Sequence, residues 1–153
     1  MHGLVGLGCQ PAPVWTADAL GTSPARAQTC PSTPEIPGQC ATRCGSYLTR
    51  FTQTDGDCGK RADQLAELAG DPATAPYPCT GNFTASADHC SVKFDIRCPT
   101  KDASGSSLAS VERGTLGWSG DAASARGDLE LWVSDAAGNT RCHSSYQVAV
   151  TRR

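Results

Sequence analysis

Nine cysteines in a chain of 153 residues constrain this fold more than any other feature of the sequence. They make up about 6% of the chain, which is typical of secreted domains held together by disulfides and unusual in the reducing cytosol. A zinc site would instead need Cys or His pairs at short, repeated spacing, and only Cys40 and Cys44 lie that close together. The sequence therefore predicts disulfides, with no metal site and no cofactor.

The supply of large apolar side chains is small for a chain of this length. Hydrophobic residues reach 39% only when Ala and Cys are counted, and the chain has one Met and three each of Phe, Tyr and Trp. Because Ala buries little apolar surface, covalent cross-links would have to offset a weak core.

Charge argues against one class of partner. The formal net charge is −2, with 13 basic and 15 acidic residues interspersed along the chain. A nucleic-acid-binding domain normally gathers its basic residues on one face, whereas this sequence has no basic run longer than a pair such as Arg152-Arg153. We therefore expect no nucleic-acid partner.

The first nine residues end in a small residue followed by a cysteine. A short apolar stretch leads to Gly8-Cys9, and residues 10–37 are then rich in Pro, Ala and Thr. This arrangement resembles the leader of small, exported, cysteine-rich bacterial lipoproteins, in which that cysteine becomes the lipidated first residue of the mature protein. The resemblance covers residues 1–9 alone and implies lipid attachment at Cys9.

The same resemblance implies a compartment and a membrane partner. It places the protein at the bacterial outer membrane surface or in the periplasm, held to the membrane by a lipid anchor, with secretion as the alternative. We expect a residual leader over 1–9, a Pro-rich flexible tether over 10–37 and a single disulfide-rich β domain over 38–153. Without Cys9 an even number of cysteines remains for disulfides, namely Cys30, Cys40, Cys44, Cys58, Cys79, Cys90, Cys98 and Cys142.

Alternating hydrophobic residues predict a mainly β domain. In residues 92–98 the apolar side chains and Cys98 would share one face of a strand, with charged side chains on the other. Short strands joined by turn-rich connections favour an antiparallel sandwich or a small barrel of about six strands, stapled by disulfides. The strands are predicted over 46–54, 81–87, 92–98, 109–118, 127–134 and 141–151.

Two further expectations concern local structure. In residues 109–118, Val111 does not match the parity of Leu116, and a bulge at Gly114 would correct the phase. In residues 60–69 the Ala and Leu residues follow helical spacing before Gly70-Asp71-Pro72, which predicts one short helix.

Strand geometry limits the disulfide pairing. Cys90 and Cys98 lie on the same face of one predicted strand, so their Cα atoms would be roughly 26 Å apart. A disulfide needs Cα atoms within about 7 Å of each other, so each must bond a different segment. Cys142 is a candidate partner for either of them, and a bond between Cys58 and Cys79 would close the predicted helical segment into a loop.

The sequence favours a binding domain over an enzyme. It has no Gly-x-Ser-x-Gly elbow. His143 follows Cys142, and adjacent residues on a strand point to opposite faces, which argues against a shared metal site. We expect an exported binding or scaffolding domain, lipid-anchored, for an extracellular or periplasmic ligand whose chemistry stays open. A secreted hydrolase and a lipocalin-like carrier of small ligands are the alternatives.

Overall fold

The computed structural model describes residues 36–70 and 74–153, which form strands and their connections. The prediction of a mainly β, antiparallel, disulfide-stapled fold is confirmed, with seven strands in place of about six. The strands are β1 (Cys44–Gly56), β2 (Gln64–Ala69), β3 (Thr80–Ala85), β4 (Ser91–Lys101), β5 (Ser107–Trp118), β6 (Ser124–Asp135) and β7 (Thr140–Arg152).

Part of the sequence-based organisation lies outside this region. The expected leader over 1–9 and nearly all of the expected tether over 10–37 are outside the described residues. Among the residues that are described, no helix is long and apolar enough to span a membrane.

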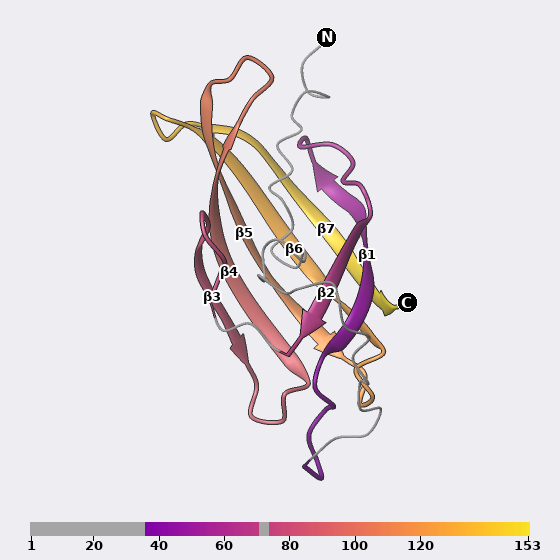
Figure 1. Cartoon of the computed structure of the whole chain (residues 1–153). Coiled ribbons are helices and arrows are strands. Elements are labelled where there is room, and N and C mark those ends of the chain that lie inside the picture. The colour runs from indigo at the N-terminus through magenta and orange to yellow at the C-terminus, as the bar shows by residue number, and fades with distance from the viewer. Residues whose placement is uncertain (1–35, 71–73) are drawn as a thin grey trace.

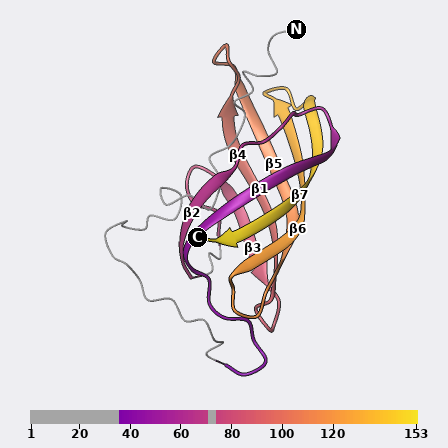
Figure 2. The same ribbon diagram turned by 90° about the vertical axis from the view of Figure 1, so that its right-hand side faces the viewer.

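The seven strands form one curved sheet in the order β2-β1-β7-β6-β5-β4-β3 (Figure 1). Every neighbouring pair is antiparallel, and strands consecutive in the chain pair with each other except for β2 and β3. Because β1 also pairs with β7, the sheet is an up-and-down half-barrel and not a two-sheet sandwich. Figure 2 shows the same curvature from the side.

The half-barrel is open along a line between β2 and β3, which we call the seam. Direction alternates along the sheet, so the two edge strands run the same way, and Figure 1 shows both of their arrows pointing downward. Direct pairing across the seam would therefore be parallel, unlike every other pair in the sheet. Within the described part of the chain, Thr74 bridges to Asn82 on the free edge of β3, and the free edge of β2 has no strand partner.

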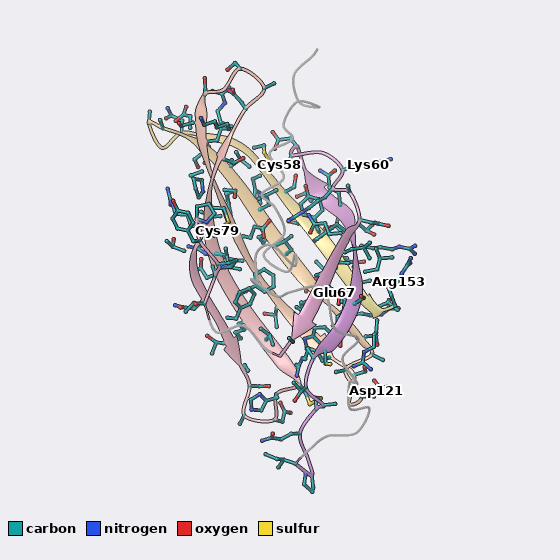
Figure 3. The ribbon with its side chains drawn as sticks, in the orientation of Figure 1. Cys58, Lys60, Glu67, Cys79, Asp121 and Arg153 are labelled. Carbon is teal, nitrogen blue, oxygen red and sulfur yellow. A yellow bond between two sulfur atoms is a disulfide. The ribbon has the colours of Figure 1, made fainter. Side chains whose placement is uncertain are left out.

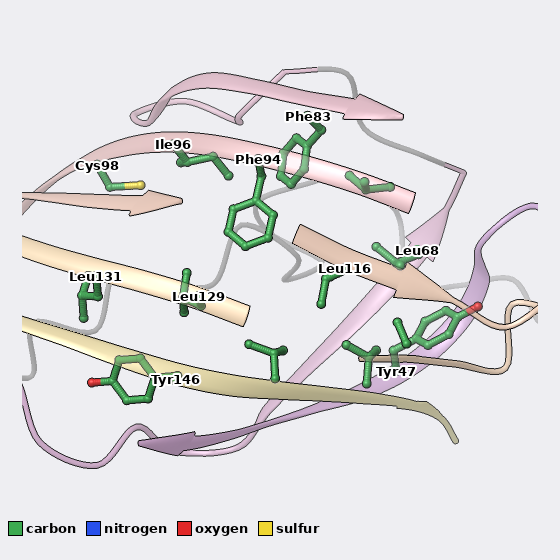
Figure 4. Packing of buried hydrophobic residues seen from close by; sticks show 14 of the residues in the cluster. Tyr47, Leu68, Phe83, Phe94, Ile96, Cys98, Leu116, Leu129, Leu131 and Tyr146 are labelled. Carbon is green, nitrogen blue, oxygen red and sulfur yellow. The ribbon is translucent and has the colours of Figure 1, made fainter. Parts of the chain in front are cut away.

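The core lies on the concave face of the sheet. On β4 the buried residues alternate with exposed ones, and β7 repeats the pattern through most of its length. Figure 4 shows that the buried side chains of different strands face one another across this concave side. The inward residues include those predicted from the sequence, Val92, Phe94, Ile96 and Cys98 on β4 and Cys142, Tyr146, Val148 and Val150 on β7.

The two ends of the half-barrel differ in what they carry (Figure 1). At the entry end, where residue 36 leads toward β1, the segment 36–43 contacts the connections 86–90 and 119–123. The backbone N–H of Cys40 donates to Asp88 O at 2.9 Å, and that of Ala41 donates to Gly120 O at 2.8 Å. The far end carries the connections 57–63, 102–106 and 136–139. Figure 3 shows Asp121 at the entry end and Cys58 at the far end.

The predicted helix over 60–69 is wrong. Residues 64–69 form β2, paired in register with β1 from Thr49↔Gln64 to Cys44↔Ala69. Burial alternates with a period of two, and Leu65, which a helix would have buried, is 60% exposed. Ala, Leu and Glu favour helices locally, but the hydrogen bonds that β1 offers outweigh this preference.

The predicted bulge at Gly114 is also wrong. The registers of β5 with β4 and with β6 run through Gly114 without a shift. Leu116 and Glu112 both point inward, and Glu112 is only 3% exposed. Val111, next to Glu112 on the strand, therefore faces outward. Gly114 serves close packing instead, because a Cβ there would meet the Phe94 ring at 2.6 Å and Asp128 O at 2.1 Å.

Three disulfides join pairs of described residues that are distant in the sequence. They are Cys40–Cys90, Cys58–Cys142 and Cys79–Cys98. Cys90 and Cys98 hold separate partners, as the strand length requires. The expected Cys58–Cys79 bond is wrong, and Cys142 bonds neither Cys90 nor Cys98. The reason is that Cys58 follows β1, which lies beside β7, where Cys142 is near the strand start.

The cross-links predict unequal losses of stability when they are removed. The Cys58–Cys142 bond spans 84 residues and the Cys79–Cys98 bond spans 19. Because a disulfide that closes a longer loop removes more entropy from the unfolded chain, the Cys58–Cys142 bond should stabilise the fold by about 1 kcal/mol more. We expect Cys58→Ser/Cys142→Ser to lower the free energy of unfolding by that much more than Cys79→Ser/Cys98→Ser, measured by urea denaturation. The pairs are matched, because each joins a buried to a partly buried cysteine. Equal losses would contradict the expectation.

Candidate functional site

The convex face of β5, β6 and β7 carries a group of polar and aromatic side chains near the far end. Strand register sets them in two rows. In the first row Trp132 lies between Val111 and His143, and in the second row Glu130 lies between Arg113 and Ser145. All of them point outward because the residues between them on each strand are buried in the core. We call the group Val111, Arg113, Glu130, Trp132, His143 and Ser145 the outer patch.

Trp132 is held by its neighbours in the first and second rows. Its ring stacks on the imidazole of His143, with centroids 4.9 Å apart and planes 19° from parallel. The guanidinium carbon of Arg113 lies 5.6 Å from the centroid of the Trp132 ring, and its Nε contacts Asp95 Oδ2 at 3.0 Å. Trp132 is therefore a half-buried aromatic surface fixed by a cation and by a second ring.

Glu130 receives hydrogen bonds from two side chains of β7. Ser145 Oγ donates to Oε1 at 2.7 Å, and His143 Nε2 lies at hydrogen-bond distance from Oε2. The Ser145 hydrogen bond is the main cause that lowers the pKa of Glu130, and the contact with His143 adds to it, while partial burial acts in the opposite direction. Glu130 is therefore held as a carboxylate in a fixed orientation.

The order of these three groups does not suit nucleophilic catalysis. In a serine triad the imidazole lies between the serine and the carboxylate, where it removes the proton from the hydroxyl. Here Glu130 lies between Ser145 and His143, and the serine hydroxyl donates to the carboxylate. The outer patch thus gives no support to the hydrolase alternative, and its chemistry suits recognition.

A second polar group lies on the concave face. Arg61, in the connection between β1 and β2, enters the interior, where its Nη1 lies 2.6 Å from Glu112 Oε1. The side chains of the two residues are only 3% and 5% exposed. The Arg61 guanidinium carbon is 4.3 Å from the centroid of the Phe51 ring, and Gln64 at the start of β2 is also buried.

Tyr146 completes this interior group. Its ring packs edge-on against Phe51 with centroids 6.3 Å apart, and its hydroxyl donates to Gly59 O at 2.8 Å. Burial raises the pKa of Tyr146. We call Phe51, Arg61, Gln64, Glu112 and Tyr146 the inner cluster.

Most of the rest of the concave face is apolar and packed. Phe83, Phe94 and Leu129 are each at most 7% exposed and belong to one contiguous cluster (Figure 4). A lipocalin-like carrier would keep such side chains around an open apolar space, so this packing favours a filled interior.

The residues singled out from the sequence are dispersed in the structure. Cys40, Cys58, Cys79, Cys90, Cys98 and Cys142 are paired, Cys44 is also disulfide-bonded, and Cys9 and Cys30 lie outside the described residues. Over 36–70 and 74–153, no group of three or more His, Cys, Asp or Glu could hold a metal ion.

Sequence reasoning missed both polar groups. A signal for Glu112 was present, because Leu108, Ser110, Glu112 and Leu116 share one parity along β5. A signal for the outer patch was the outward position of Trp132 on β6. The contact between Glu130 and His143 beside it arises only from the fold, which pairs β6 with β7. Comparison of this chain with family models, with curated proteins and with solved structures finds no match.

The hydrogen bond from Ser145 predicts a measurable change in Glu130. We expect Ser145→Ala to raise the pKa of Glu130 toward its ordinary value of 4.5, as followed by NMR titration of the carboxyl carbon. Ser107→Ala, at the exposed start of β5, should leave that pKa unchanged. A pKa that stays low in Ser145→Ala would assign the effect to other groups.

The lowered pKa of Glu130 also determines how its contribution to stability changes with pH. Because the pKa of Glu130 is lower in the folded protein than in the unfolded chain, its contribution to stability is fully present above the unfolded value. It is lost as the pH falls through the folded value. The difference in stability between wild type and Ser145→Ala should therefore shrink in acid.

Proposed function

We propose that this chain is an exported binding domain, attached to a bacterial envelope membrane by lipid on Cys9, that recognises a protein partner through the outer patch. The three disulfides of the described residues indicate an oxidising, extracytoplasmic compartment. The lipid anchor and the partner are inferences drawn from the cysteine count and from the chemistry of the outer patch.

The pairing of the cysteines carries the proposal. Six of the seven cysteines in the described residues bond one another, and Cys44 is also disulfide-bonded. Cys9 and Cys30 are the two cysteines outside the described residues, and we propose Cys30 as the partner of Cys44, which leaves Cys9 for a different reaction. Cys9 follows the small residue Gly8, which is where the resemblance to lipoproteins places the lipid.

The position of the outer patch fits a domain held at one end. Residue 36 leads into the entry end, whereas Trp132 and His143 lie next to the connection 136–139 at the far end (Figure 1). A domain tethered through residues 10–37 would thus hold the outer patch on the side away from the membrane.

The composition of the outer patch favours a protein partner. Trp and Arg are the side chains that most often dominate the free energy of protein association. Here Trp132 is stacked on His143 and lies beside Arg113, and Glu130 is fixed by two hydrogen bonds. Such prior ordering lowers the entropy cost of binding.

Mass spectrometry of the membrane fraction tests the anchor. The full chain is produced in a bacterium that processes lipoproteins, and we expect diacylglycerol and fatty acyl groups on Cys9. Cys9→Ser should move the protein to the soluble fraction with its disulfides intact. Cys30→Ser is the matched control, because it should keep the anchor and release a free thiol at Cys44. Wild-type protein that is soluble and carries an unmodified Cys9 would refute the anchor.

In-cell photo-crosslinking tests the outer patch. A photoreactive phenylalanine is placed at Ser134, next to Trp132 on the outer face of β6, or at Arg126, on the same face of β6 toward the entry end. We expect a discrete crosslinked protein from position 134 that disappears in Trp132→Ala, and none from position 126. Equal products from both positions, or products that survive Trp132→Ala, would refute the outer patch as the interface.

A further inference from the structure

The inner cluster has the composition of a site that recognises a cation. A positive group binds best over the face of an aromatic ring, and strongly so when it is desolvated and faces a carboxylate. Phe51 supplies the ring at 4.3 Å from the Arg61 guanidinium, and Glu112 supplies the carboxylate at 2.6 Å. Arg61 occupies this position from within the chain.

Arg61 fits the site incompletely. Among the described residues, the buried Nε and Nη1 of Arg61, Oε1 of Glu112 and Oε1 of Gln64 have no hydrogen-bond partner. The Arg61–Glu112 contact is therefore close in distance but lacks the alignment of a hydrogen bond. Buried polar atoms without partners cost free energy that a better-aligned donor and acceptor would recover.

The segment that carries Arg61 is fixed on one side. Cys58 is bonded to Cys142, Asp57 exchanges hydrogen bonds with the backbone of His143, and Gly59 O accepts from Tyr146. Arg61 comes after these attachments and before β2, the edge strand at the seam. Figure 3 shows Cys58 and Lys60 together in this connection at the far end. Withdrawal of Arg61 would thus require movement of residues 60–63, with the disulfide intact.

We propose that Glu112, Phe51 and Tyr146 form a binding site for a guanidinium group of a ligand, and that Arg61 is an internal occupant which the ligand displaces. The displaced Arg61 side chain regains hydration at the surface, which offsets its loss of contact with Glu112. The proposal does not depend on the lipid anchor or on the outer patch.

Chemical rescue tests the site. Arg61→Ala removes the atoms of an ethylguanidinium group, so we expect this variant to unfold at a lower temperature than wild type. Added ethylguanidinium should raise its melting temperature in a saturable way, whereas the uncharged isostere ethylurea should not. Glu112→Gln in the Arg61→Ala background should abolish the rescue. No saturable rescue, or rescue that survives Glu112→Gln, would overturn the proposal.

A surface arginine is the matched control. Arg113 also pairs with a carboxylate, Asp95 at 3.0 Å, and also lies near an aromatic ring, but its side chain is 59% exposed. Arg113→Ala should show no rescue by ethylguanidinium at the same concentrations. Equal shifts in Arg61→Ala and Arg113→Ala would show a general effect of the additive and would overturn the proposal.

Displacement is tested on the wild-type protein by NMR titration with ethylguanidinium. If Arg61 competes for the site, wild type should bind saturably with an affinity at least roughly tenfold weaker than that of Arg61→Ala. Absence of saturable binding by wild type would overturn displacement and leave Arg61–Glu112 as a fixed structural pair. If Arg61→Ala does not fold without a ligand, the same site is tested by its refolding yield. That yield should be higher in ethylguanidinium than in ethylurea, and equal yields would overturn the proposal.

Discussion

The pairing of β1 with β7 is the interaction on which the rest of the structure depends. It joins the two ends of the described chain from Tyr47↔Arg152 to Gly56↔Ser144, with one register shift between Gln53 and Asp55. Closing so long a loop is costly in entropy, and the Cys58–Cys142 bond lowers that cost by restricting the unfolded chain. The same pairing places Asp57 beside His143 and directs Arg61 into the interior, so the inner cluster depends on it.

The remaining strands are organised by local chemistry. Asp88, Asp102 and Asp121 each lie in a tight connection between neighbouring strands of the meander β3–β7, and Asp135 ends β6 at the connection to β7. Hydrogen bonds from the hydroxyls of Ser86, Ser104 and Ser119 are the main cause that lowers the pKa of the first three carboxyls, and the backbone N–H of Asn139 is the main cause that lowers the pKa of Asp135. These exposed turns fix each hairpin within a few residues, whereas β1 joins the sheet through β7, which is distant in the sequence, and β2 joins it through β1.

This division explains what the sequence could reveal. The alternation in β4 and β7 was visible because it is set by neighbours two residues apart, and strand length correctly separated the partners of Cys90 and Cys98. The helix over 60–69 was predicted wrongly because β2 exists only through its pairing with β1. The phase of β5 was misread because Glu112 faces inward toward Arg61, a partner about fifty residues away in sequence. The outer patch likewise depends on register, which brings Glu130 to Ser145 and His143.

The seam and the buried ion pair are connected by geometry. With seven alternating strands, β2 and β3 run in the same direction and cannot close the barrel in the antiparallel way that serves every other pair. Closure at this line has to come from side chains. Along β2 the inward residues change from Leu68 near the entry end to Gln64 near the far end, three residues after Arg61 in the sequence. The edge strand β2 thus presents an apolar side chain to the interior near the entry end and a polar one near the far end. In the displacement that we propose for Arg61, the loss of its contact with Glu112 is offset by the hydration that the released cation regains in water.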